Sequence, residues 1–137
     1  MKIFLALLAA SILLTIGCSS NKKSADTLLH DIWVLESIDG QTYSRVENQS
    51  LHPTIEIYLT EERFSGNTGC NNMSGKLTVD GSSISFSDIV TTKMFCDGVD
   101  ETSFLTDLGK ANKYKIEKMR LYLFEDEKEI LVFKKID

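Results

Sequence analysis

The strongest constraint on the fold of this chain is an alternation of apolar and polar residues with a period of two. In residues 54–60 the apolar side chains are Ile55, Ile57 and Leu59, with polar or amphipathic residues between them. Since successive side chains of a strand point to opposite faces, this pattern predicts a strand with one buried face. The chain is therefore expected to fold around a sheet that is half covered.

The same pattern recurs along most of the chain, and turn residues separate its segments. Asp39-Gly40, Glu61-Glu62 and Asp80-Gly81 are turn signals, and the acidic segment 125–129 separates the last two strands as a hairpin. Further strands are predicted over residues 31–38, 63–66, 74–79, 83–86, 120–124 and 129–133. Trp33 is expected in the core as a residue of the first strand.

One segment has a helical period instead. Asp100 is a suitable N-cap, Glu101 places an acid in the first turn, and Lys113 places a cation in the last turn. The apolar residues that would share one face of this helix are Phe104, Leu105, Leu108 and Ala111. The predicted fold class is α+β, with a curved antiparallel β-sheet or partial barrel packed with one α-helix over about residues 100–113.

The N-terminus has the form of a lipoprotein signal. Lys2 precedes an apolar run over residues 3–16, which is shorter than the roughly 20 residues of a transmembrane helix. Residues 15–18, Thr-Ile-Gly-Cys, resemble a bacterial lipobox, in which the cysteine becomes the lipidated N-terminus. We expect a signal peptide over 1–17, lipidated Cys18 with a flexible tether over 18–27, and a domain over 28–137. An ordinary cleaved signal or an uncleaved anchor remains open.

The expected location is the cell envelope, with the membrane as partner through acyl chains such as palmitate. Ser19 follows Cys18, rather than the Asp that retains some lipoproteins in the inner membrane. We therefore expect the outer membrane, with the domain facing the periplasm, rather than the inner membrane.

Charge excludes nucleic acid as a partner. The chain has 15 basic and 20 acidic residues and a net charge of −5, which becomes −6 without residues 1–17 because these contain one Lys. Binding to phosphates needs a cationic face, and none is evident in this sequence. Nothing in the sequence indicates an obligate oligomer, so a monomeric domain is expected.

If Cys18 carries lipid, Cys70 and Cys96 remain. Two thiols in an oxidising envelope are expected to form a disulfide. Across 26 residues the bond would contribute about 3.5 kcal/mol in the chain-entropy model. Two buried free thiols, or a metal pair with His30 or His52, stay open as alternatives, although the spacing matches no zinc pattern.

Residues 67–76 are the most distinctive stretch, and their glycines suggest a phosphate loop. The spacing of Gly69 and Gly75 is one residue too long for that motif, and Leu77 replaces the hydroxyl residue that would hold magnesium. We interpret the stretch as structural, with Gly66, Gly69 and Gly75 allowing positive φ.

No catalytic residue, cofactor or metal is expected. No serine lies in a nucleophile elbow, and a Cys–His pair would compete with the disulfide. His30 and His52 are expected at the surface, and no pair of carboxylates can be nominated for acid–base chemistry. We therefore predict that the chain is not an enzyme.

Several motifs together resemble the META domain family, the HslJ-type heat-shock lipoproteins. They include the Trp33-Val34-Leu35 opening, the Gly69-Cys70-Asn71 element, and Thr92 and Cys96 in a T-x-x-x-C pattern that precedes a helix. The resemblance covers residues 29–134 and implies curved antiparallel strands with one helix. It also implies that the motif residues determine the fold: Trp33, Gly66, Gly69, Cys70, Asn71, Thr92 and Cys96.

The resemblance carries over no catalytic residue, and it implies a role linked to envelope stress. The family has a Gly before the Leu of its second-last strand, whereas Lys118-Met119-Arg120 stands there in this chain. That departure puts the turn in question.

These features predict a non-enzymatic envelope lipoprotein that acts as a protein-binding or chaperone-like module in stress tolerance, with an envelope protein as its partner. The alternative is a carrier of a small hydrophobic ligand or lipid, which would need an apolar cavity. A third possibility is an enzyme or metal protein that uses Cys70, Cys96 and a histidine.

Overall fold

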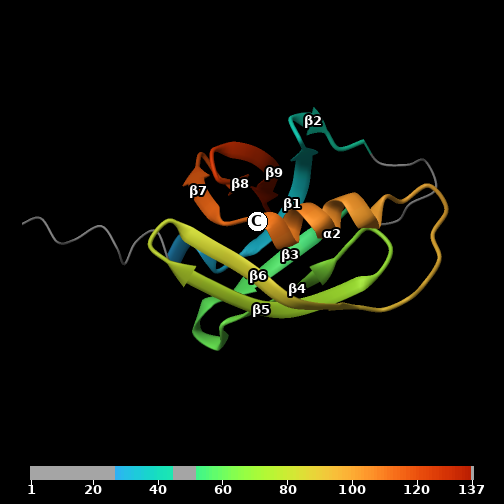
Figure 1. Ribbon diagram of the computed structural model, residues 1–137, viewed down its shortest axis with the longest axis horizontal. Helices are drawn as coiled ribbons and strands as arrows, with labels where there is room; N and C mark the ends of the chain where they lie inside the picture. Colours follow the sequence, from blue (N-terminus) through green and yellow to red (C-terminus); the bar gives the residue numbers. More distant parts are fainter. Residues whose placement is uncertain (1–26, 45–51, 137) are drawn as a thin grey trace, which may run out of the picture.

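The computed structural model describes residues 27–44 and 52–136 (Figure 1). The predicted signal peptide, Cys18 and nearly all of the tether lie outside these residues. Residues 27–29 form a helical turn. The elements that follow are β1 (Ile32–Ile38), β2 (Gln41–Thr42), β3 (Thr54–Tyr58), the 3-10 helix η1 (Leu59–Glu61), β4 (Arg63–Asn67), β5 (Asn72–Asp80), β6 (Ser83–Thr91), α2 (Glu101–Lys110), β7 (Lys113–Glu117), β8 (Arg120–Glu125) and β9 (Lys128–Lys135).

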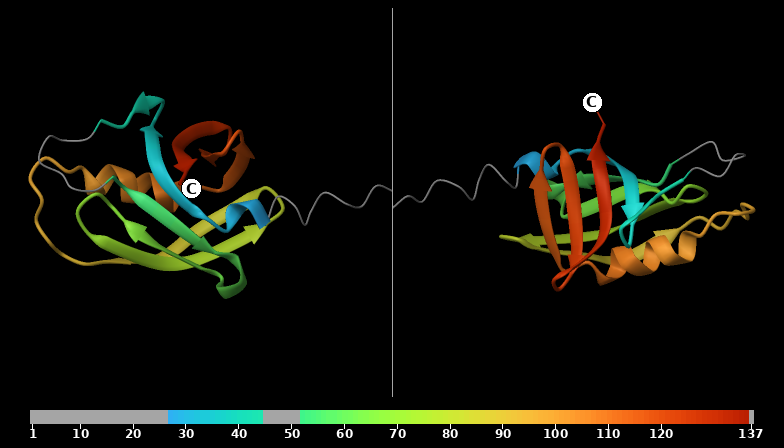
Figure 2. Two further views of the ribbon diagram at one scale, coloured as in Figure 1. Left: turned by 180° about the vertical axis from the view of Figure 1, so that it is seen from behind. Right: turned by 90° about the horizontal axis from the view of Figure 1, so that it is seen from above.

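The strands form one antiparallel sheet that closes on itself. Its order is β2-β1-β3-β4-β5-β6-β7-β8-β9, and β9 also pairs with β1. The curved antiparallel sheet predicted from the alternation is confirmed, and its strands curl into a barrel (Figure 2). The weakest join is between β6 and β7, whose register consists of Ser83 opposite Lys113.

The helix α2 lies beside this weak join, against β6 and β9 (Figure 1). Its residues Phe104 and Leu108 are buried in the core, and the ring of Phe104 packs edge-on against Phe133 with centroids 6.3 Å apart. The helix therefore supplies apolar side chains where the strands diverge.

The predicted end of the helix is wrong by one turn. Asp100 is the N-cap as expected, but the helix ends at Lys110, and Lys113 begins β7 instead of lying in the last helical turn. The backbone N–H of Asn112 already bonds to the carbonyl of Phe124 at 2.8 Å. Hydrogen bonds to neighbouring strands therefore fix the backbone of residues 112 and 113, which the apolar spacing had placed in the helix.

Side chains fill the interior of the barrel. Trp33 is 1% exposed, and its indole N–H donates to the carbonyl of Leu29 at 3.1 Å. The rings of Phe64 and Phe86 meet edge-on at 5.1 Å. The other buried apolar residues of the strands include Leu35, Ile55, Ile57, Met73, Leu77, Ile84, Tyr114, Leu121, Leu123, Ile130, Leu131 and Phe133.

Several strand boundaries differ from the predictions: β5 and β6 are longer than predicted, with β6 ending at Thr91 instead of residue 86, and β2 and β7 were not predicted. The strand over residues 54–60 ends at Tyr58, and Leu59 enters η1, where it is only partly buried. The C-terminal hairpin is confirmed, but its strands extend into the acidic segment, so Asp126 and Glu127 alone separate β8 and β9. Backbone pairing thus continues through residues whose side chains are charged.

Gly66 and Gly75 are needed for close approach rather than for positive φ, which corrects the expectation for both. A Cβ at Gly66 would collide with the carbonyl oxygen of Thr54 on β3. A Cβ at Gly75 would lie 2.7 Å from the ring of Phe64. Of the three glycines, Gly69 does have a positive φ, of 96°.

The turn between β7 and β8 forms without glycine. Glu117 pairs with Arg120, so Lys118 and Met119 make a two-residue loop, with φ of 50° and 62°. This is the geometry of a type I′ hairpin, which favours Asn-Gly. The turn that the missing glycine had put in question is therefore present. Its left-handed φ angles at Lys118 and Met119 lower the stability of the protein relative to glycine at these positions.

Met119→Gly is expected to raise the free energy of unfolding by about 1 kcal/mol, because the left-handed conformation costs roughly that much for a residue with a Cβ. Urea unfolding would measure the change. The turn at Asp39-Gly40 has positive φ at both positions, so Gly40→Met is the matched reverse substitution and should destabilise the protein. Equal stability of both variants and the parent would contradict this account of the turns.

Candidate functional site

Three segments that are distant in the sequence meet at one end of the barrel. They are the β4–β5 connection, the segment between β6 and α2, and the first turn of α2, which lie at the right in Figure 1. The side chain of Asn71, from the first of these segments, bonds to the other two. This end of the molecule contains most of the motif residues named from the sequence.

Asn71 is 4% exposed and uses both ends of its amide. Its Oδ1 accepts from the Thr92 hydroxyl at 2.8 Å and from the Met94 N–H at 2.7 Å. Its Nδ2 donates to the Met94 carbonyl at 3.0 Å and to the Glu101 carboxylate at 2.9 Å. Asn71 therefore binds the backbone of Met94 on both sides and ties it to the helix.

The Glu101 carboxylate is the second centre of this network. It accepts from the hydroxyl of Thr68 and from the backbone N–H of Asn71, the latter at 3.2 Å. Thr68 is 1% exposed, and its Oγ1 also accepts from the N–H of Asn71 at 2.8 Å. The position of Glu101 at the start of α2 adds the favourable interaction of an anion with a helix N-terminus.

A disulfide joins Cys70 to Cys96, with their Cα atoms 5.8 Å apart. Among the alternatives left open by the sequence, this is the one that the structure contains. Within residues 27–44 and 52–136, no group of three or more His, Cys, Asp or Glu is arranged to hold a metal ion. The bond fixes the segment after β6 to the same connection that carries Asn71.

The predicted motif residues therefore fall into two places. Gly69, Cys70, Asn71, Thr92 and Cys96 share this end of the barrel. Gly66 lies on β4 and Trp33 in the core. Sequence reasoning missed the role of Thr68 and gave Glu101 only a first-turn role, because no local pattern links residues 30 positions apart.

This network displays an apolar pair of side chains to solvent. Phe95 is 92% exposed and Met94 is 59% exposed. The backbone of Met94 is held by Asn71, and Phe95 precedes the disulfide-bonded Cys96. An exposed aromatic residue on a segment fixed in this way is suited to contact with another molecule.

The histidines lie apart from one another in aromatic contacts. His30 is exposed as expected, and its ring meets Tyr58 edge-on at 5.9 Å. His52 is only partly exposed, contrary to the expectation of a surface residue. Its ring lies 5.6 Å from that of Tyr43, and its buried Nδ1 has no hydrogen-bond partner in the described part of the chain.

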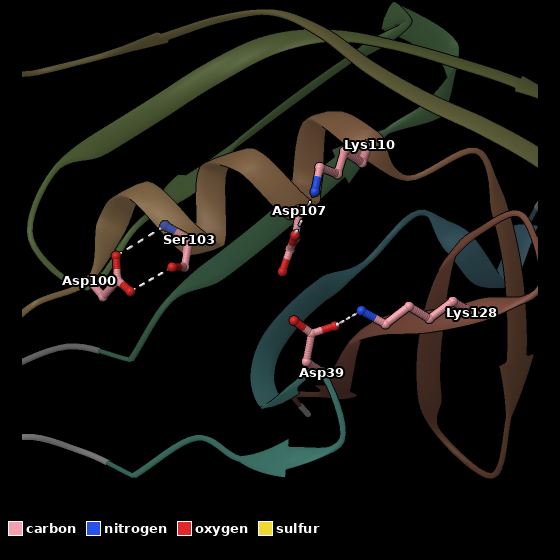
Figure 3. A network of polar contacts seen from close by, with 6 residues as sticks. All are labelled: Asp39, Asp100, Ser103, Asp107, Lys110 and Lys128. Carbon is pink, nitrogen blue, oxygen red and sulfur yellow. Dashed lines mark hydrogen bonds and ion pairs between the residues drawn. The ribbon is translucent and has the colours of Figure 1, made fainter.

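A second polar cluster lies along α2 and the β1–β2 turn (Figure 3). Burial, together with the charge of Asp39, raises the pKa of the Asp107 carboxyl, although Lys110 lies 3.8 Å from it. Lys128 pairs with Asp39 at 2.6 Å. The N-cap Asp100 behaves oppositely: hydrogen bonds from Ser103 lower the pKa of its carboxyl.

A pocket of about 200 Å³ lies at η1 and β5. Leu59, Glu62, Leu77 and Val79 line it.

None of the described helices is long and apolar enough to cross a membrane.

Asn71→Asp is expected to lower the free energy of unfolding by about 3 kcal/mol at pH 7, because it places a second carboxylate against Glu101 in a buried site. Asn72→Asp is the matched control, since Asn72 is exposed and its Oδ1 already acts as an acceptor, from Asn67. Adding Glu101→Gln to Asn71→Asp should restore part of the loss. Equal losses in both single variants, measured by urea unfolding, would argue against a special role for Asn71.

Asp107→Asn is expected to raise the melting temperature at pH 7, with the gain fading towards pH 3. A carboxyl whose pKa is raised by folding favours the protonated form, so it costs stability once pH rises above its unfolded pKa. Asp100→Ala is the comparison on the same helix, and its loss of about 1 kcal/mol at pH 7 should shrink in acid. Thermal melts across this range would refute the assignment if the two variants shared one pH trend.

Solved structures share this fold. An NMR structure of a protein from Burkholderia xenovorans is 23% identical over 81% of this chain and 86% of that one, with a TM-score of 0.64. A second NMR structure is 22% identical over 80% of this chain and 92% of that one, with a TM-score of 0.61. A crystal structure of a DUF4847 family protein from Bacteroides vulgatus is 15% identical over 80% of this chain and 96% of that one, with a TM-score of 0.57.

At these identities the structures show a similarity of fold alone. No curated protein matches the chain. The sequence model of the META domain family, in contrast, matches residues 26–137, which include every residue of the barrel, the helix and the Asn71 network. The chain belongs to the META domain family.

Proposed function

We propose that this protein is a lipid-anchored lipoprotein of the cell envelope, whose META domain binds a protein partner through the segment of Met94 and Phe95. It acts without catalysis, as a binding or chaperone-like module in envelope stress tolerance. The domain faces the periplasm from the outer membrane and is attached through Cys18.

The observation that carries this proposal is the exposure of Phe95 on a fixed segment. The Phe95 side chain has almost no apolar contacts within the domain, so a partner can bury it without breaking any. Aromatic residues are also enriched where proteins bind one another. Because the disulfide and Asn71 hold the neighbouring residues, little conformational entropy is lost when a partner binds Phe95. A mobile loop of the same composition would bind less tightly.

The anchor is supported by the sequence alone. A basic residue, a short apolar run and the Thr-Ile-Gly-Cys segment at 15–18 together have the form of a lipobox signal. A disulfide between Cys70 and Cys96 fits an oxidising compartment. Both features agree with an envelope location.

A carrier of a hydrophobic ligand has less support. The barrel interior is occupied by buried side chains that include Trp33, Phe64, Phe104 and Phe133. The pocket at Leu59 and Val79 has a volume of about 200 Å³, below the roughly 300–1,000 Å³ of ligand pockets. Phe95, in contrast, is directly available to a partner.

A photo-reactive phenylalanine analogue at position 95, introduced in cells, is expected to crosslink to one dominant envelope protein. The same analogue at position 115 is the control, because Lys115 is exposed on β7, away from the Asn71 network. Crosslinks are read by mass spectrometry, and those from position 95 should weaken with Cys18→Ser, which removes the anchor. Identical products from both positions, or none from 95, would count against the proposed binding segment.

Phe95→Ala separates binding from stability. The side chain is 92% exposed, so its loss should change the free energy of unfolding by less than about 0.5 kcal/mol. Phe104→Ala, in the core, should cost about 3–5 kcal/mol. A Phe95→Ala protein that keeps the parental partner would overturn the proposal.

A further inference from the structure

A group of exposed apolar residues surrounds the point where the N-terminal segment joins the domain. We call it the N-terminal edge and define it by Leu28, Ile32, Met119 and Ile136, which are 42–57% exposed. These residues come from the helical turn 27–29, β1, the β7–β8 turn and the chain end. Large apolar side chains scattered singly are ordinary on a surface, but a contiguous group marks a contact surface.

Backbone hydrogen bonds bring Ile32, Met119 and Ile136 together. Trp33 pairs with Lys135 across β1 and β9, and the N–H of Ile136 donates to the carbonyl of Ile32 at 3.0 Å. The N–H of Lys135 donates to the carbonyl of Met119 at 2.9 Å. In the right-hand view of Figure 2 the helical turn 27–29, the β7–β8 turn and the C-terminus lie along the same upper edge.

The N-terminal segment is short enough for this edge to reach a membrane that holds Cys18. From Thr27 the chain leads back to Cys18 through nine residues, which span at most about 30 Å when fully extended. The segment that bears Phe95 lies at the opposite end of the molecule from residues 27–29 (Figure 1). A bilayer that holds Cys18 is therefore within reach of the N-terminal edge and is remote from Phe95.

Charge at the edge agrees with a lipid surface. Lys118 and Lys134 are exposed beside Met119 and β8, and Lys22 and Lys23 lie in the connecting segment. Basic side chains near a bilayer are attracted to anionic headgroups, and apolar side chains enter the boundary between headgroups and acyl chains. Asp31 and Glu117 lie at the same edge, and each forms an ion pair there, with Lys135 and Lys115. The chain without residues 1–17 has a net charge of −6, so the exposed Lys118 and Lys134 favour this side of the domain for contact with anionic headgroups.

We infer that the N-terminal edge rests on the phospholipid surface, with Leu28, Ile32, Met119 and Ile136 at the level of the headgroups. The inference rests on the proposed lipid anchor, which supplies the attachment. The lipid occupant is distinct from the protein partner proposed for Phe95, and the domain holds the two surfaces apart. The edge thus fixes the orientation of the domain on the membrane.

The test uses the full-length protein purified from membranes. Met119→Cys is labelled with a thiol-reactive fluorophore, and Val90→Cys, an apolar and exposed position on β6, is the matched control. The parent, treated in the same way, gives the background. Each protein is placed in vesicles of phosphatidylethanolamine and phosphatidylglycerol that contain lipids with a nitroxide quencher near the headgroup.

Quenching at position 119 is expected to exceed that at position 90 by at least about twofold. The excess should fall in the Lys118→Glu, Lys134→Glu variant. Equal quenching at the two positions, greater quenching at position 90, or failure to associate with vesicles would overturn the inference. A label at position 119 that is protected from solvent but is not quenched by the nitroxide lipid would also overturn it, because protein and not lipid would then cover this edge. The mass of the N-terminal peptide separately shows whether Cys18 carries lipid, so a missing anchor is distinguished from a wrongly assigned edge.

Discussion

The Asn71 side chain is the interaction on which the functional end of this molecule depends. A single amide binds both backbone groups of Met94, the hydroxyl of Thr92 and the carboxylate of Glu101. The amide of Asn71 is itself buried, so it depends on these partners for the hydrogen bonds that it would otherwise make to water. Asn71 therefore joins the loop between strands, the segment after β6 and the helix into one unit.

The closed sheet makes this arrangement possible. Close approach around β4 and β5 requires glycine at positions 66 and 75. Hydrogen bonds from Asn71 to Glu101 hold the β4–β5 connection against the start of α2. Closure through β1 and β9 gives β9 a partner strand on each side, so β9 is not an open sheet edge. In the described strands, only one residue pair joins β6 to β7 in register. The buried side chains of Phe104 and Leu108, from α2, fill the core beside this join.

The fold was largely predictable from the sequence because strands and helix follow apolar periods. Ile55 and Ile57 are buried as their alternation requires, and Asp100 caps the helix. The helix end was misplaced since Ala111 fits a helical spacing, while hydrogen bonds from neighbouring strands decide the backbone at Asn112. Periodicity describes which face is apolar, but it carries no information about tertiary hydrogen bonds.

The candidate site was only partly predictable. The glycines, Asn71 and both cysteines stood out as a motif, but the link from Asn71 to Glu101 depends on how the chain returns to the same end. The exposure of Phe95 was equally hidden, because apolar Met94 and Phe95 stand in a polar segment without strand or helix periodicity, and burial there depends on tertiary contacts. Local patterns therefore identified the residues of the network without their partners.

The pairing of β1 with β9 has a consequence for what the two chain ends can reach. Because Ile136 is bonded beside Ile32, any sequence fused after the C-terminus would emerge on the same side as the N-terminal segment. Such an addition would compete for space with whatever lies against that side, and it would leave Phe95 unobstructed. A label on the first turn of α2 would instead lie near Phe95 and leave the side of the chain ends unobstructed, since Asn71 bonds to Glu101 in that turn.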